Sequence, residues 1–492
     1  MPILDRPLIA WTAVLYLLGM VGIGLWAARR TRSPRDFFIA GQSLGLLVTG
    51  LATMSAAFSG FVFVGGPGLT YRMGTSSFLI CASVGFTPAL LCWTVGRRLR
   101  RLAAGADVLT LSDVVLARWG DRRAAGLTAV AVLLGSVAYL GAQIQAVGVV
   151  LEAVFGAREW LGALGLPAMM LVGVAVVAAY SVAGGMVAGV YTDLVQGLLM
   201  MVAALGVFAT AVGAGGGMER IVESVAASER FGPGFLDPTA GVPLWTALGF
   251  FFVFSIGTLG QPQMLHKFFM LKDPRALRWM PLVLGGSQTV CLLLWVGLGL
   301  TVPALVASGA LPPLASPDEA TPAFLLAFAP DWLAGLAFAG LLAAVMSTAD
   351  SFLNLAAAAL VRDLPRALGR EPRDEVGRGR WAVAALAIGA AVTAWLYGDL
   401  VALLGTFAFG TLAAALAPAM GIGLAWDRVS GRTIALSIAC GLGIHLALEL
   451  AGRLGALPAE LDGVLPSALA LGTSLLVLLG AGWLESPNPR GA

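Results

Sequence analysis

The chain has 492 residues, of which 59% are hydrophobic and only 12% are charged. Its mean hydropathy of +0.89 excludes a soluble globular protein and indicates a protein that crosses a membrane several times. The four cysteines and two histidines lie far apart, so neither a disulfide framework nor a zinc site or histidine-based catalysis is predicted. The net charge of +3 says little, because in membrane proteins the placement of basic residues matters more than their sum.

Apolar runs of about 17 residues or more can cross a bilayer as α-helices. We therefore expect an all-α integral membrane protein of about thirteen transmembrane helices, in a single domain over residues 1–492. The first run follows no basic segment and precedes no obvious cleavage site, so it is predicted to be a retained helix. The runs lie at residues 8–28, 44–72, 76–96, 124–155, 161–183, 190–214, 243–262, 280–306, 331–361, 382–397, 401–425, 433–452 and 465–484.

The basic residues fix the expected orientation of these helices. With the N-terminus outside and the C-terminus in the cytoplasm, most of the 30 Lys and Arg residues fall in cytoplasmic segments, as the positive-inside rule requires. The arginine-rich segment 362–380 also contains acids and lies between two spans, so it is interpreted as a topology signal rather than a nucleic-acid site. Six arginines fall outside: Arg6, Arg72, Arg158, Arg220, Arg230 and Arg453.

Two of the apolar runs are rich in residues that interrupt helices. TGLATMSAAFSGFVFVGGPGL (49–69) contains five glycines and a proline, and FFFVFSIGTLGQPQ (250–263) ends in Ser, Gly, Thr and Pro. These runs open two successive sets of five spans that cross the membrane in opposite directions. The arrangement is typical of inverted-repeat transporters, in which free carbonyls at helix breaks hold ions and substrate. The alternative is that these glycines only allow close helix packing.

The repeat boundaries follow from this pattern. We expect one extra helix at 8–28, repeat one at 44–214, repeat two at 243–425 and two C-terminal helices at 433–484. Such a five-plus-five inverted repeat is a leucine-transporter-like fold.

The ninth span carries a row of small polar residues. In LLAAVMSTADS (341–351), Ala344, Ser347, Thr348 and Ser351 recur at spacings of three and four, so they share one helix face. Neutral oxygens of this kind suit a small alkali cation that must also be released. The alternative is that each hydroxyl only satisfies the carbonyl one turn back.

Ionisable and amide groups within the spans are further candidates. Asp193 and Asp350 lie at membrane depth, where a charge is costly and indicates function. Asp193 could instead cap its helix. Gln143 and Gln145 are two residues apart and cannot share a face, so only one of them is expected to line a cavity.

Five segments carry a resemblance to the sodium:solute symporter family, in particular its sodium/proline symporter group. The resemblance implies the five-plus-five inverted repeat described above. The segments occur in order as RDFFIAGQSLG (35–45), SAAFSGF (55–61), GVYTDLVQGLLM (189–200), GQPQMLHKFF (260–269) and LLAAVMSTADS (341–351).

The resemblance also implies positions for the coupling ions. The principal sodium ion would be bound by the carbonyls of Ser55, Phe58 and Ala344 and by the hydroxyls of Ser347 and Thr348. A second sodium site nearer the cytoplasm would use Asp193, Asp350 and Ser351, together with Ser347.

A substrate pocket is expected beside the two breaks, formed by Phe61, Gly65, Gln143, Phe254 and Thr258. Proline transporters of the family carry a tryptophan and a tyrosine where this chain has Phe254 and Thr258. Their aspartate, arginine and tryptophan are replaced by Ala57, Gln42 and Phe61. These departures leave the solute open.

We therefore predict a secondary active transporter in the cell (inner) membrane that couples sodium to uptake of a small organic solute, most simply an amino acid such as proline. Proton coupling through Asp193 or Asp350, a short monocarboxylate or other small metabolite as solute, and a membrane solute sensor are the alternatives. An enzyme is not expected, because convergent catalytic groups and an ATP-binding motif are missing from the sequence. The expected partners are sodium, the solute and the lipid bilayer, without nucleic acid or an obligate protein partner.

Overall fold

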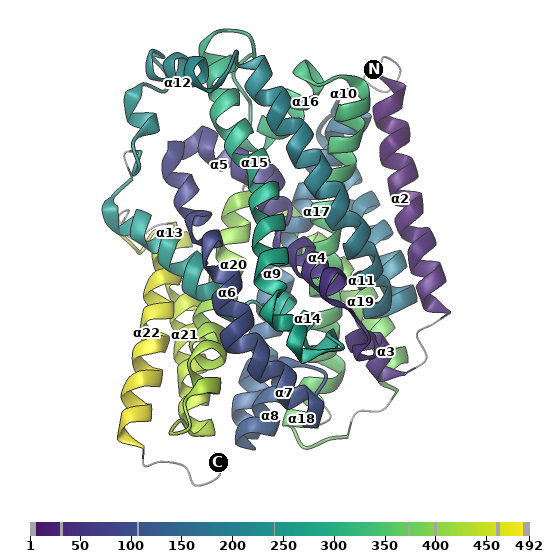
Figure 1. The fold of residues 1–492 in the computed structure, drawn as a ribbon, viewed down its shortest axis with the longest axis vertical. Coiled ribbons are helices and arrows are strands. Elements are labelled where there is room, and N and C mark those ends of the chain that lie inside the picture. The colour runs from purple at the N-terminus through teal and green to yellow at the C-terminus, as the bar shows by residue number, and fades with distance from the viewer. Residues whose placement is uncertain are drawn as a thin grey trace.

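The structure is a computed structural model that describes residues 6–29, 33–105, 108–240, 242–371, 374–397, 401–458 and 463–485. These residues form helices of several kinds and no strand; a single isolated β-bridge joins Leu44 and Leu271. Most long helices lie roughly along the long axis of the molecule (Figure 1). In that view α2 begins at the upper end, and α22 ends at the lower end on the opposite flank.

The expectation of an all-α membrane protein is confirmed, but the number of thirteen spans is not. Among the described residues, ten helices are long and apolar enough to cross a membrane, or eleven if a bent pair counts as one span. The run predicted at 76–96 forms only short 3-10, α and π segments, and Pro88 lies within it. Proline lacks the backbone N–H that a continuous helix needs, which is consistent with this fragmentation. The run predicted at 382–397 lies within α19, which is not among the ten.

The elements of the first half are α2 (Pro7–Ala28), α3 (Pro34–Ile39), α4 (Leu46–Ala57), η2 (Phe61–Gly65), α5 (Gly66–Met73), η3 (Gly74–Ile80), η4 (Ala82–Gly85), α6 (Thr87–Leu90), η5 (Leu91–Gly96), α7 (Arg97–Gly105), α8 (Leu111–Trp119), α9 (Arg122–Phe155), α10 (Ala157–Leu161), α11 (Gly165–Ala214) and α12 (Met218–Ala226). Those of the second half are α13 (Leu244–Ile256), η8 (Gly257–Gly260), α14 (Pro262–Met270), α15 (Met280–Ala307), α16 (Ala320–Phe328), α17 (Asp331–Ala358), η11 (Ala359–Asp363), α18 (Leu364–Ala367), α19 (Glu375–Tyr397), α20 (Val401–Gly421), α21 (Gly431–Arg453) and α22 (Leu465–Leu484).

Both predicted helix breaks are present. Helix α4 stops at Ala57, Phe58 has an extended backbone (φ −96°, ψ 95°), and the chain resumes at an angle of 54°. The second break lies at Gln261 (φ −79°, ψ 105°), between η8 and α14. At each break the last carbonyls of one half and the first N–H groups of the other have no partner within the helix. Side chains therefore take up such backbone groups at both breaks: Ser347 donates to the Ser55 carbonyl at the first, and Gln261 Nε2 donates to the Gly257 carbonyl at the second.

Helix α11 contains most of the predicted span 161–183 and all of 190–214, separated at Gly185. This glycine has φ 54° and ψ −147°, outside helical geometry. A Cβ atom at this position would lie 2.6 Å from the Phe37 ring of α3, so the turn needs glycine for both its backbone and its space. The break at Gly185 places the two predicted spans, 161–183 and 190–214, on either side of a turn.

Helix α17 is, with α20, one of the two most enclosed long helices among the described residues. It packs against α2, α4, α9 and α11, and every residue from Ala337 to Ala358 is buried. Its polar side chains therefore face neighbouring helices rather than lipid. Polar groups buried in this way need hydrogen-bond partners, so the side chains of Ser347 and its polar neighbours are expected to contact groups on the adjacent helices.

Candidate functional site

The hydroxyls of α17 meet the end of α4 at the first helix break. The Ser347 Oγ donates to the Ser55 carbonyl at 2.8 Å and also approaches the Ala344 carbonyl at 3.1 Å. The Thr348 Oγ1 lies 3.3 Å from the Ala56 carbonyl and 3.2 Å from that of Ala344. These oxygens come from two helices and all lie in the protein interior. The structure thus gathers four of the five residues expected at the principal ion site.

Two further residues at the first break, Phe58 and Ala56, differ in whether they contact the hydroxyls of α17. Phe58, the fifth expected residue, is the first non-helical residue after α4, and its N–H donates to the Met54 carbonyl at 2.9 Å. Sequence reasoning overlooked the carbonyl of Ala56, which contacts Thr348. The available signal was its place in the last turn before the break, where carbonyls lack helical partners.

A cavity of about 80 Å³ lies next to the first helix break. Three residues expected in the substrate pocket line it: Phe61, Phe254 and Thr258. None of the described residues around this cavity carries an ionised side chain. Sequence reasoning did not identify several other lining residues, which come from distant helices: Tyr139, Gln263, Gln288, Trp295 and Phe409.

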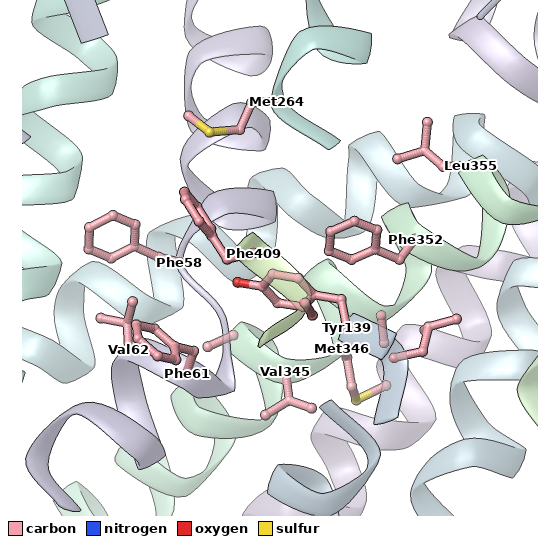
Figure 2. Packing of buried hydrophobic residues seen from close by; sticks show 14 of the residues in the cluster. Phe58, Phe61, Val62, Tyr139, Met264, Val345, Met346, Phe352, Leu355 and Phe409 are labelled. Carbon is pink, nitrogen blue, oxygen red and sulfur yellow. The ribbon is translucent and has the colours of Figure 1, made fainter. Parts of the chain in front are cut away.

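Aromatic rings form much of the cavity wall. The Phe254 ring stacks between those of Phe61 and Phe409, with centroid distances of 5.5 and 4.4 Å, and Trp295 meets Phe61 edge-on at 5.9 Å. Figure 2 shows Phe61 and Phe409 in the same region as Tyr139, whose ring stacks on Phe352 at 4.5 Å. Stacked and edge-on arrangements are the favoured geometries of aromatic pairs, and each pair adds about 0.5–1.5 kcal/mol beyond its buried area. The wall suits an apolar part of a small solute.

Two amides supply the polar side of the same cavity. The Oε1 atoms of Gln263 and Gln288 are buried without a hydrogen-bond partner among the described residues. An amide offers both a donor and an acceptor, so the pair can serve either charge of a zwitterion. A buried polar atom without a partner is costly, so a hydrogen-bonding group in the cavity would stabilise these amides.

Gly65 and Gln143 lie outside this cavity, in contrast to the sequence-based expectation. A Cβ atom at Gly65 would be 3.0 Å from the Ala402 backbone nitrogen, because α20 packs directly on this glycine. The Gln143 Oε1 instead accepts a hydrogen bond from the Gly60 N–H at 3.0 Å. Gln143 therefore satisfies one of the free N–H groups at the helix break and fixes its shape.

The three residues expected at a second ion site also lie in the interior. Asp350 accepts a hydrogen bond at Oδ1 from Ser181 and, at 3.1 Å, another from Asn354, whereas its Oδ2 is buried without a partner among the described residues. The Ser351 hydroxyl is likewise buried and has no partner in the part of the chain that the structure describes. Asp193 is engaged by a residue that sequence reasoning had not considered, because Lys267 Nζ lies 2.6 Å from its Oδ2.

These observations together define a class of protein. Two interrupted membrane helices meet a polar helix, with a cluster of oxygens at one side and a small cavity at the other, as in transporters that move an ion together with a solute. Within the described residues, no group of three or more His, Cys, Asp or Glu side chains could hold a metal ion.

The chain belongs to the sodium:solute symporter family, whose family model matches residues 37–438. It is 26% identical over 436 residues to the sodium/pantothenate symporter of Escherichia coli, covering 85% of this chain and 86% of that protein. It is 28% identical to the sodium/proline symporter of the same organism over 436 residues, covering 85% and 83% of the two chains. The protein is therefore a multi-pass membrane transporter rather than an enzyme, and sodium is its coupling ion.

Solved structures confirm the fold. A sodium-coupled sialic acid symporter in a substrate-bound outward-open state aligns with a TM-score of 0.77 at 17% identity, covering 97% of this chain and 98% of that one. MHP1, a nucleobase-cation-symport-1 family transporter, aligns with a TM-score of 0.55 at 16% identity, covering 94% and 98%. At such identities the likeness concerns the fold alone.

Proposed function

We propose that the protein carries out sodium-coupled uptake of a small zwitterionic solute, most simply an amino acid such as proline. The cavity beside the first break carries this proposal. At about 80 Å³ it is far smaller than the roughly 300–1,000 Å³ of sites for larger ligands. Its aromatic wall suits a compact apolar ring, and its two free amide oxygens suit an ammonium group.

The principal sodium ion is proposed to lie between α4 and α17. The carbonyls of Ser55, Phe58 and Ala344 and the hydroxyls of Ser347 and Thr348 supply neutral oxygens. The observed approach of Ser347 to Ser55 supports this assignment, because atoms of the two helices already converge there. By joining the two helices, the ion would order the break that borders the solute cavity.

Coupling then follows from shared elements. Phe58 and Phe61 line the solute cavity, and the same break carries the carbonyls of the ion site. Each ligand stabilises the arrangement that the other needs, and a coupling free energy of about 1–3 kcal/mol is sufficient. A membrane potential of 100 mV adds about 2.3 kcal/mol for each sodium charge moved. We further propose a second sodium at Asp350 and Ser351, because Asp350 Oδ2 and the Ser351 hydroxyl have no hydrogen-bond partner among the described residues.

Pantothenate, or another small carboxylate, is the second candidate solute, because a pantothenate symporter is among the similar proteins. Pantothenate is longer than proline and carries a net negative charge, whereas no ionised side chain lines the described cavity. The geometry therefore favours a smaller and electrically neutral solute.

Uptake by proteoliposomes tests these assignments. Purified protein is reconstituted and supplied with radiolabelled proline, pantothenate or acetate under a sodium gradient, a proton gradient or neither. We expect proline to accumulate under the sodium gradient alone. Accumulation of pantothenate instead would overturn the choice of solute, and accumulation under the proton gradient would overturn sodium coupling. Binding without accumulation would favour a sensor.

We also propose that the N-terminus faces outward and the C-terminus inward. The distribution of basic residues supports this orientation. Single cysteines replace Ser228, which follows α12, or Arg428, which precedes α21, in a variant that lacks the four native cysteines. In intact cells, an impermeant maleimide should label the cysteine at Ser228 and spare the one at Arg428 until the cells are lysed. The reverse pattern would invert the topology.

A further inference from the structure

The buried ammonium group of Lys267 has no role in the proposed transport mechanism. Lys267 lies on α14, within an apolar span, and its side chain is only 1% exposed. Lysine is rare in this protein, since all but two of its 30 Lys and Arg residues are arginines. An ammonium group at membrane depth is costly unless it is paired, so its partner indicates its role.

That partner is a carboxylate expected at the second sodium site. Lys267 Nζ lies 2.6 Å from Asp193 Oδ2, and both side chains are fully enclosed. Among the described residues, the Met186 sulfur also lies 3.8 Å from this ammonium. An ammonium is a compact point charge, and it can occupy the place beside a carboxylate that an alkali ion would take.

A sodium ion would have to share Asp193 with this ammonium. Two unit positive charges about 5 Å apart in an environment of effective dielectric constant about 20 weaken ion binding by roughly two orders of magnitude. The Asp193 carboxylate is thus already neutralised. One oxygen of each carboxylate, Asp193 Oδ1 and Asp350 Oδ2, has no hydrogen-bond partner among the described residues. Asp350 differs in that its described partners are the neutral groups of Ser181 and Asn354.

We propose that Lys267 is a built-in cation that takes the place of sodium at Asp193, so that Asp193 is not a sodium ligand and any second sodium binds at Asp350. The inference rests on the proposed function, since it concerns the number of ions at the same site. It makes Lys267 the residue that limits how many sodium ions the transporter binds.

The fit of Asp350 against α11 supports this division of roles. A Cβ atom at Gly189 would lie 2.1 Å from Asp350 Oδ2, so the carboxylate rests on the bare backbone of this glycine, one turn before Asp193. The two carboxylates and the lysine together carry a single net negative charge. One further monovalent cation balances it, and its place is at Asp350, whose described partners are neutral, rather than at Asp193, whose charge Lys267 already offsets.

Equilibrium binding of radiolabelled sodium to the purified protein tests the proposal without knowledge of the solute. Lys267→Gln frees Asp193, so this variant should bind one more sodium ion per protein than the wild type. Lys267→Arg keeps the charge and should bind the wild-type number. Lys272→Gln, at the other lysine of the chain, which is exposed, should also leave the number unchanged.

A double variant covers the case in which Lys267→Gln does not fold. Lys267→Met with Asp193→Asn removes both charges and should retain the wild-type number of bound sodium ions. A loss of one ion in this variant, or no gain in a folded Lys267→Gln protein, would overturn the role of Lys267. Wild-type protein that binds no sodium at all would instead refute the proposed ion site itself.

Discussion

Replacement of Ser347 and Thr348 together by alanine is expected to abolish sodium-dependent uptake at ordinary sodium concentrations. Both hydroxyls approach backbone carbonyls of α4. Interactions with a charged group are worth about 1.5–3 kcal/mol each. Loss of two such interactions should weaken sodium binding at least about 100-fold. Sodium titration of uptake in proteoliposomes measures the change.

A threonine on another helix provides the matched control. Thr393 lies on α19 and donates to the Gly389 carbonyl one turn back, so Thr393→Ala should leave the sodium titration unchanged. The double variant should need a much higher sodium concentration for half-maximal uptake, while the protein remains inserted in the membrane and monodisperse. An unaltered sodium titration in the double variant would contradict the proposed position of the principal sodium ion.

Gly60→Ala is expected to lower transport at least about tenfold, because it changes the shape of the first break. A Cβ atom at Gly60 would lie 2.6 Å from Ala146 Cβ and 2.9 Å from Val345 Cγ2. It would also crowd the Gln143 oxygen that accepts from the Gly60 N–H. Overpacking of this kind costs about 1–3 kcal/mol and is relieved by moving the backbone. Initial uptake rates, normalised to inserted protein, measure the effect.

Replacement of an uncrowded helical glycine by alanine is the control. It separates the effect of crowding at the break from the effect of replacing any glycine in a helix. Gly22 of α2 has no atom within 4 Å of the position of an added Cβ, so Gly22→Ala should transport like the wild type. Equal rates for the two variants would show that the break tolerates a side chain and would contradict its proposed role in coupling.

Residues near one another in the sequence were predicted best. The apolar runs predicted the membrane class because about twenty apolar residues suffice to cross a bilayer, whatever their neighbours. The glycines and prolines at 49–69 and 250–263 predicted both interruptions, since those residues act on their own helix. The spacing of Ser347 and Thr348 placed them on one face for the same reason.

Contacts between residues on different helices could be identified only from the tertiary structure. The sequence showed neither that Lys267 pairs with Asp193 nor that Trp295 and Phe409 face Phe61 and Phe254. Gly65 and Gln143 were expected at the solute, but α20 covers the first and the break engages the second. Periodicity fixes which residues share a helix face, whereas the packing of helices fixes what that face meets. For this protein, the sequence determined the breaks and the polar helix, and only the packing decided which charges and rings surround them.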